Sequence, residues 1–124
     1  MNVKELIDQI DGHLYNPSAN LEREIKGGCG ADLMSDVLAS IQPEAVLLTG
    51  LCNPQVVRTA LIADVKAIIF VRGKNPAEET IALALEEDMP IISSPLGLYK
   101  LSGLLMLAGL PSLEKTMNHS FDEG

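Results

Sequence analysis

The sequence predicts an α/β fold made of βαβ units, with a parallel or mixed sheet in two or three layers. From residue 43 onward, apolar runs alternate with segments of helical periodicity, which is typical of βαβ units. The runs are residues 45–50, 66–73 and 90–94, and the helical segments are residues 53–65, 75–88 and 95–110. Each run is apolar at successive positions, as expected for a strand that helices cover on both faces.

The three helical segments share one kind of start. Asn53, Asn75 and Ser94 each stand directly before a proline. Asn and Ser side chains can accept hydrogen bonds from the free amides of a first helical turn, and proline fits the first helical position. Glu78 and Glu79 follow in the second of these helices, where acids suit the helix dipole. We therefore expect the helices to begin at these three residues.

The N-terminal part of the chain predicts two more helices and a pair of short strands. Apolar residues at helical spacing in "VKELIDQI" predict a helix over residues 3–10. Asn-Pro and Ser-Ala-Asn then separate short strands near residues 13–15 and 22–26. "ADLMSDVLASI" predicts a second helix over residues 31–41. We interpret the intervening "GGCG" as a bend that lets the second strand turn into this helix.

The last helical segment is more apolar than one core-facing stripe requires. Its leucines and Met106 spread around the helix. Such a helix is either central or packed against another subunit. The candidate interface residues are Leu101, Leu104, Leu105 and Leu107. We expect a single domain over residues 1–110, followed by a polar, loosely ordered tail over residues 111–124.

Composition and charge exclude several classes of partner. The chain has 124 residues, which suits one domain, and a net charge of −8 with its basic residues scattered. Nucleic acids and anionic lipids both attract clustered Lys and Arg, so neither nucleic acid nor a membrane is an expected partner. Only Cys29 and Cys52 are present, and the N-terminus carries no signal-peptide pattern. We therefore expect a cytoplasmic protein with reduced thiols.

Polar and basic residues follow the predicted strands at their carboxyl ends, where open parallel sheets bind ligands. The candidate ligand-binding residues are Thr49, Gly50, Asn53, Arg72, Gly73, Lys74, Asn75, Ser93 and Ser94. Two cations, several hydroxyls and helix N-termini at one edge predict a site for a small anionic metabolite. Each residue also has a simpler interpretation, as a helix cap, a turn glycine or a solvated cation.

Motifs for a cofactor, a metal or catalysis are not evident. The glycine-rich stretch lacks the third glycine of a dinucleotide fingerprint, because Leu33 stands there. Asp32 and Asp36 could hold Mg²⁺ from one helix face, although a solvated face is the simpler interpretation. Two cysteines are too few for a zinc or iron–sulfur site within one chain, and Cys52 near a helix start could have a lowered pKa. We expect no cofactor, no metal site and no catalytic residues.

Three stretches together share the order and spacing of a known family. They are "VKELIDQI…HLYNPSANLEREIKGG", "ADLMSDVLASI" and "AIIFVRGKNPAEETIALALEEDMPIISSPLGLYKLSGLL", which cover most of residues 3–110. In these stretches the chain resembles a stand-alone DRTGG domain and is similar to the N-terminal domain of HPr kinase/phosphorylase. The resemblance implies an α/β domain of regulatory type, without kinase activity, because the phosphate-binding loop of those kinases belongs to a separate domain. It also implies relatives that are fused to CBS domains and phosphotransacetylases, or that are described as hydrogenase-associated or iron–sulfur-binding.

Two functions of different classes follow. The first is a non-catalytic regulatory or ligand-sensing module that works as a homo-oligomer and binds a small anionic metabolite at the carboxyl edge of the strands. The alternative is an interaction subunit that docks onto a redox or metabolic enzyme, such as a hydrogenase, through its apolar last helix. A small enzyme is the third and least supported hypothesis, because nothing in the sequence sets a nucleophile against a base.

Overall fold

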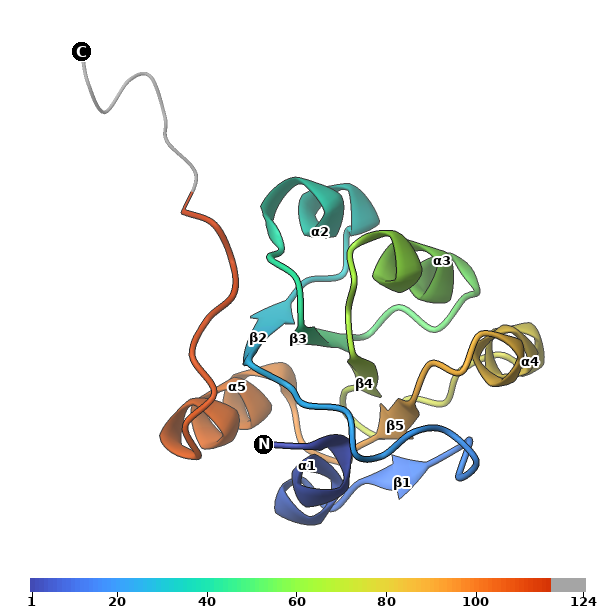
Figure 1. The fold of residues 1–124 in the computed structure, drawn as a ribbon, viewed down its shortest axis with the longest axis horizontal. Helices are drawn as coiled ribbons and strands as arrows, with labels where there is room; N and C mark the ends of the chain where they lie inside the picture. Colours follow the sequence, from blue (N-terminus) through green and yellow to red (C-terminus); the bar gives the residue numbers. More distant parts are fainter. Residues whose placement is uncertain (117–124) are drawn as a thin grey trace.

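The computed structural model describes residues 1–116 as a central sheet between two layers of helices (Figure 1). The elements are α1 (Val3–Gln9), β1 (His13–Leu14), β2 (Gly27–Gly30), α2 (Met34–Ser40), β3 (Ala45–Thr49), α3 (Gln55–Ile62), β4 (Ala67–Phe70), α4 (Glu78–Glu86), β5 (Ile91–Ser93) and α5 (Leu98–Leu107). Helices α2, α3 and α4 cover one face of the sheet, and α1 and α5 cover the other (Figure 1). The α/β prediction is confirmed, and of its two alternatives the three-layer arrangement is the one observed.

The sheet is mixed. Its strand order is β1-β5-β4-β3-β2, in which β2 to β5 run parallel and β1 pairs antiparallel with β5. Each crossover through α2, α3 and α4 moves the chain one strand further across the sheet, so the carboxyl ends of β2 to β5 all meet at one edge. That edge carries the loops in which the sequence predicted a ligand site.

Alternate residues of the central strands enter two separate hydrophobic cores. Leu47 and Ile68 face the α2–α4 layer, whereas Val46 and Ile69 face α1 and α5. All four side chains have no exposed surface. The continuous apolar runs in the sequence therefore reflect strands that are buried on both faces, as predicted. Among the elements of residues 1–116, no helix is both long enough and apolar enough to cross a bilayer.

Two of the three predicted helix starts are displaced. α3 begins near the expected place, and the Asn53 side chain accepts a hydrogen bond of 3.1 Å from the Gln55 amide. α4 begins at Glu78 and α5 at Leu98, three residues or more beyond Asn75 and Ser94, and neither helix has a side-chain cap. The intervening residues form the turns that carry the chain from the sheet edge back over its face.

The second strand lies where the sequence predicted a bend. The expected strand near residues 22–26 is absent, and β2 is formed by the glycine-rich Gly27–Gly30, parallel to β3. Glycine is a weak strand former, but here the absence of side chains permits a close approach of backbone. A Cβ on Gly27 would lie 2.5 Å from both the Pro111 carbonyl oxygen and Leu113 Cγ. Tertiary packing, not local propensity, therefore places this strand.

The C-terminal segment that the sequence assigned to a loose tail is fixed to the domain over its first residues. The Leu113 amide donates to the Gly28 carbonyl at 2.8 Å, and the Lys115 amide donates to the Ser40 carbonyl at 2.7 Å. Residues 117–124, which complete the predicted tail, lie outside the described residues. The order of residues 111–116 comes from backbone hydrogen bonds to distant parts of the chain, which a polar sequence does not signal.

Candidate functional site

The nine predicted ligand-binding residues all lie at the carboxyl edge of β3, β4 and β5 or in the loops that follow these strands. They divide into two groups. Gly50, Arg72, Gly73 and Lys74 line the open surface of the edge, whereas Thr49, the two serines and the two asparagines form side-chain hydrogen bonds that hold the loops.

The loop between β4 and α4 holds its two cations in a defined backbone conformation. Arg72 and Gly73 both adopt left-handed backbone conformations, with φ of 59° and 66°. The Arg72 amide donates to the Leu96 carbonyl at 2.8 Å, and the Gly73 amide donates to the Ser94 carbonyl at 2.7 Å. These bonds tie the β4–α4 loop to the β5–α5 loop. Asp11, Glu44, Asp64 and Asp88 also have positive φ, so the conformation of Arg72 defines the turn and does not by itself mark a functional site.

Arg72 and Lys74 present unpaired positive charge to solvent. Both are exposed, and neither forms an ion pair in the part of the chain that the structure describes. Arg72 Nε lies 3.8 Å from where a Cβ on Gly97 would stand, over the start of α5. Lys74 Cδ lies 3.6 Å from the corresponding position on Gly50, beside the end of β3. The two cations therefore lie over neighbouring loops of one edge.

Asp32 is part of this edge, although the sequence assigned it to the face of a helix together with Asp36. α2 begins only at Met34, which leaves Asp32 in the loop after β2. Its carboxylate accepts hydrogen bonds of 2.7 Å from the Gly50 amide and 3.2 Å from the Thr49 hydroxyl. These donors at the end of β3 are thus already occupied. Asp32 follows β2 by two residues, and this position at the carboxyl end of a strand was the signal that could have placed it at this edge.

The remaining predicted residues support the loops. Ser94 is fully buried, and its hydroxyl donates to the Ile10 carbonyl at 2.7 Å while accepting from the Leu96 amide at 3.2 Å. Ser93 donates to the Lys74 carbonyl at 3.2 Å. Asn75 accepts from the Tyr15 hydroxyl at 2.6 Å, and Asn53 accepts from the start of α3. Their hydrogen bonds hold the loops in place, and Ser94 has no exposed surface for a ligand.

Cys52 lies beside Asp32 and Lys74 but is not an activated thiol. Burial raises its pKa, Lys74 lowers that pKa and Asp32 raises it, with burial the largest of the three effects. The expectation of a lowered pKa near a helix start is therefore wrong. Its Sγ points to the Gly50 carbonyl at 3.6 Å. Within residues 1–116 there is no group of three or more His, Cys, Asp or Glu side chains that could hold a metal ion.

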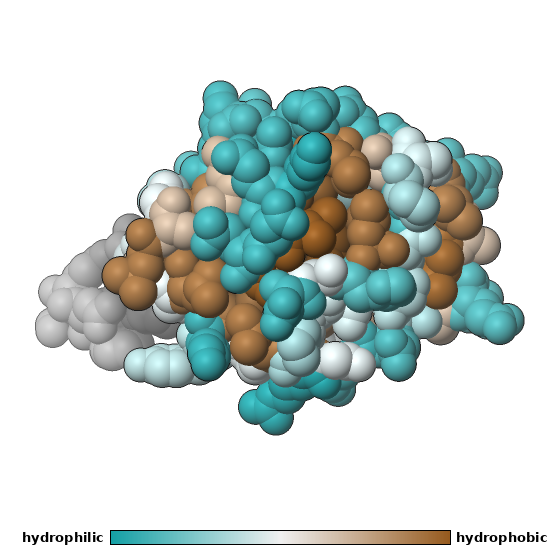
Figure 2. All heavy atoms as spheres, turned by 90° about the horizontal axis from the view of Figure 1, so that it is seen from below, coloured by the Kyte–Doolittle hydropathy of each residue, from teal (hydrophilic) through white to brown (hydrophobic). Residues whose placement is uncertain are grey.

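The four leucines proposed as an interface have different environments. Leu101 and Leu105 are buried in the core between α5 and the sheet, so they are not available to another subunit. Leu104 is partly buried against the same core, and Leu107 is 92% exposed. Tyr99, on the same helix, is 94% exposed. Figure 2, seen from the side of α1, β1 and α5, shows hydrophobic residues that reach the surface between hydrophilic ones.

Fold and site together define a small three-layer α/β domain with two exposed cations at the carboxyl edge of its sheet. The model of the DRTGG domain family matches residues 5–108. The chain therefore belongs to the DRTGG domain family, as the resemblance in its sequence indicated. A comparison with curated proteins gives no match.

A solved structure shares the fold. It comprises the CBS and DRTGG domains of the regulatory region of Clostridium perfringens pyrophosphatase, complexed with the activator diadenosine tetraphosphate. The TM-score is 0.70 at 18% sequence identity, and the similarity covers 94% of this chain and 51% of that chain. This chain thus spans about half the length of the pyrophosphatase region. At this identity the likeness concerns the fold alone.

Proposed function

We propose that this chain is a non-catalytic regulatory module that binds a small anionic metabolite, of the nucleotide class, at the carboxyl edge of its sheet. The DRTGG fold supports a regulatory role, because the pyrophosphatase region with the same fold is regulatory and was solved with a dinucleotide activator. The serine hydroxyls at this edge donate to backbone carbonyls and not to a side chain that could act as a base. Two unpaired cysteines are in keeping with a reducing compartment, the cytoplasm.

The single observation that carries this proposal is the pair of cations on a preorganised loop. Arg72 and Lys74 project from a turn whose amides are bonded to the next loop, and no acid among residues 1–116 forms an ion pair with either side chain. Arg binds phosphate through a rigid fork of donors and Lys as a point charge. Because the loop is already ordered, little conformational entropy is lost when an anion binds.

Asp32 narrows the class of ligand. Its carboxylate already accepts hydrogen bonds from the end of β3. Because the carboxylate is negative, it would repel an anion from Gly50, whereas Arg72 and Lys74 would attract one. An exposed carboxylate has further acceptor capacity, which suits hydroxyl or amino groups of a ligand. A molecule with phosphate at one end and a sugar or base at the other fits this polarity. Nucleotides and sugar phosphates are the compounds of this kind.

The test compares two double variants of equal charge. Arg72→Gln/Lys74→Gln removes both cations of the site, and Lys4→Gln/Arg58→Gln removes two exposed cations of α1 and α3. Titration calorimetry with diadenosine tetraphosphate, ATP and glucose 6-phosphate should show binding of at least one probe to the wild-type chain and to the control. The site variant should lose tenfold or more in affinity. No binding of any probe, or equal loss in both variants, would contradict the proposal.

The exposed residues of α5 favour a second role, in association. We propose that Tyr99, Met106 and Leu107, which are 94%, 59% and 92% exposed, form a contact with another copy or with a partner enzyme. Large apolar side chains that are exposed together are enriched at interfaces. Leu107→Glu should shift the solution mass from oligomer to monomer, or end co-purification with a partner. A wild-type chain that is monomeric and captures no partner enzyme would argue against this contact.

A further inference from the structure

The outer edge of β2 is occupied by a segment from the end of the chain, residues 111–115. The Gly28 amide donates to the Pro111 carbonyl at 2.9 Å, and its carbonyl accepts from the Leu113 amide at 2.8 Å. This pairing is parallel, like the other strands around it. On the far side of the segment, the Gln42 amide donates to the Leu113 carbonyl at 2.8 Å. The segment therefore lies between β2 and the connection from α2 to β3, bonded on both sides.

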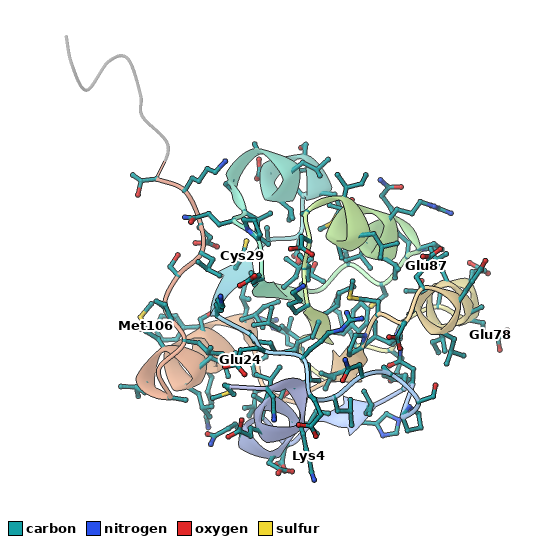
Figure 3. All side chains as sticks on the ribbon, viewed as in Figure 1. Lys4, Glu24, Cys29, Glu78, Glu87 and Met106 are labelled. Atoms are coloured by element: carbon teal, nitrogen blue, oxygen red, sulfur yellow. The ribbon has the colours of Figure 1, made fainter. Side chains whose placement is uncertain are left out.

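The groove between β2 and the connection from α2 to β3 has a shape that fits residues 111–115. Gly27 leaves room for it, because a Cβ there would overlap the Leu113 side chain and the Pro111 carbonyl. Glu114 places its carboxylate 2.9 Å from the Gly30 amide, and it lies close enough to the Cys29 thiol to raise the pKa of that thiol, second to the effect of burial. A cavity of about 100 Å³ lies between the segment, β2 and α5, with Cys29 and Met106 in its lining. Figure 3 shows Cys29 and Met106 on the two sides of the segment's path.

Few apolar contacts anchor the segment. Pro111, Ser112, Glu114 and Lys115 are exposed, and Leu113 is only half-buried. The segment is thus held by backbone hydrogen bonds, by the Glu114 carboxylate contact and by the packing of one side chain, Leu113, against the core. Regions with few buried apolar contacts open at low free energy compared with the whole domain. When it opens, the strand edge regains unpaired donors and acceptors, which are a template for pairing with another chain.

We propose that residues 111–115 of a second copy of this chain can bind the outer edge of β2 in place of the chain's own segment. A second copy carries the leucine and the acid that the groove fits, in the correct spacing. Exchange reproduces every hydrogen bond of the closed form between two chains and needs no new contact. The connection can act as a hinge at Gly109, which has φ of 102° and where an added Cβ would meet no atom within 4 Å. Each copy then contributes Leu113 and Glu114 to the partner's edge.

Two complementary variants of the full chain test this. Leu113→Asp should empty the groove but leave it intact, while Gly27→Ala should block the groove and release an intact segment. Mixed together, they should form a heterodimer with twice the 13.3 kDa mass of one chain, measured by light scattering after gel filtration. Gly28→Ala is the matched control, because a Cβ there meets only Val46 Cγ1 at 3.7 Å and Val46 O at 3.9 Å. Its mixture with Leu113→Asp should contain no more dimer than the wild type.

Thiol reactivity of Cys29 reports the state of the groove in the same samples, in a Cys52→Ser background. Leu113→Asp should react tenfold or more faster than the wild type, and addition of a Gly27→Ala chain that also carries Cys29→Ser should restore protection. A reactive Cys29 without heterodimer would refute exchange between copies. A thiol that stays protected in both variants would show that the segment is not released, which would also refute it. Leu113→Ala replaces the aspartate variant if circular dichroism shows that the latter is unfolded.

Discussion

We predict that Ser94 has a structural role and not a ligand-binding role, and its replacement by alanine tests this prediction. The sequence placed Ser93 and Ser94 together in the candidate site. In the structure Ser94 is fully buried and bridges the end of α1 to the loop before α5 through its hydroxyl. Ser93 is 8% exposed and makes one longer hydrogen bond, to the carbonyl of the exposed Lys74. Adjacent serines therefore serve as a matched pair.

The expected magnitudes follow from the groups left without partners. Ser94→Ala leaves the Ile10 carbonyl unpaired in a fully buried residue and the Leu96 amide unpaired in a half-buried one. Each buried unsatisfied group costs about 1–3 kcal/mol, so we expect a loss of about 2–4 kcal/mol in the free energy of unfolding. Ser93→Ala leaves only the Lys74 carbonyl, which water can reach, so its loss should be about 1 kcal/mol or less.

Urea denaturation monitored by circular dichroism measures both losses. With a slope of about 2 kcal/mol per molar urea, the midpoint should fall by about 1–2 M for Ser94→Ala and by about 0.5 M or less for Ser93→Ala. Nucleotide affinity of the folded proteins should be unchanged by Ser94→Ala. Equal midpoints for the two variants would refute the reasoning. If Ser94→Ala kept the wild-type midpoint but lost nucleotide binding, Ser94 would have a role in binding and not in stability.

Three further outcomes are expected in urea denaturation. Burial, reinforced by Glu114, raises the pKa of Cys29 from 9.0 to about 12, so the unfolded chain loses the thiol proton at a lower pH than the folded chain. The free energy of unfolding should therefore fall as pH rises through that interval, by up to about 1.4 kcal/mol per pH unit. Cys29→Ala should make this fall less steep. At a concentration where the chain is monomeric, Leu101→Ala should lose about 2–5 kcal/mol in the free energy of unfolding and Leu107→Ala under about 0.5 kcal/mol, because the first is buried and the second exposed. Similar losses would contradict these burials. Asn16→Ala should lose about 2–4 kcal/mol in the free energy of unfolding, because the buried Asn16 side chain donates to the Met89 carbonyl and accepts from the Ile91 amide at the start of β5. Asn20→Ala should lose less than about 1 kcal/mol, because Asn20 is exposed. A midpoint for Asn16→Ala as high as that of Asn20→Ala would show that these bonds contribute little.

The local hydrophobic pattern was sufficient to predict the strands that are buried on both faces of the sheet. The runs that became β3, β4 and β5 contain few polar residues because helices cover both of their faces, and the alternation with helices predicted their parallel pairing. The positions of Arg72 and Lys74 followed from the same reasoning, since the carboxyl ends of parallel strands meet at one edge. The fold class and the place of Arg72 and Lys74 at this edge of the sheet were therefore predictable.

Local pattern failed where a distant segment decides the structure. Asp32 shows helical spacing with Asp36, yet the Gly50 amide and the Thr49 hydroxyl hold it in a loop. Asn75 and Ser94 are residue types typical of helix caps, but Asn75 accepts from Tyr15 and the Ser94 hydroxyl donates to Ile10, and both partners are far along the chain. The partners in these hydrogen bonds are close in space but distant in sequence, so no local window contains both of them.

The sequence by itself determined the α/β class of this protein, its apolar strands and the edge at which polar loops gather, because hydrophobic periodicity records which faces are buried. Only the tertiary structure decided that "GGCG" is a strand. Glycines have no side chains to show a burial pattern, and Gly27–Gly30 becomes a strand because β3 on one side and residues 111–113 on the other supply its hydrogen bonds. The same contact turned the start of an expected loose tail into an ordered edge, from which the exchange between copies was inferred.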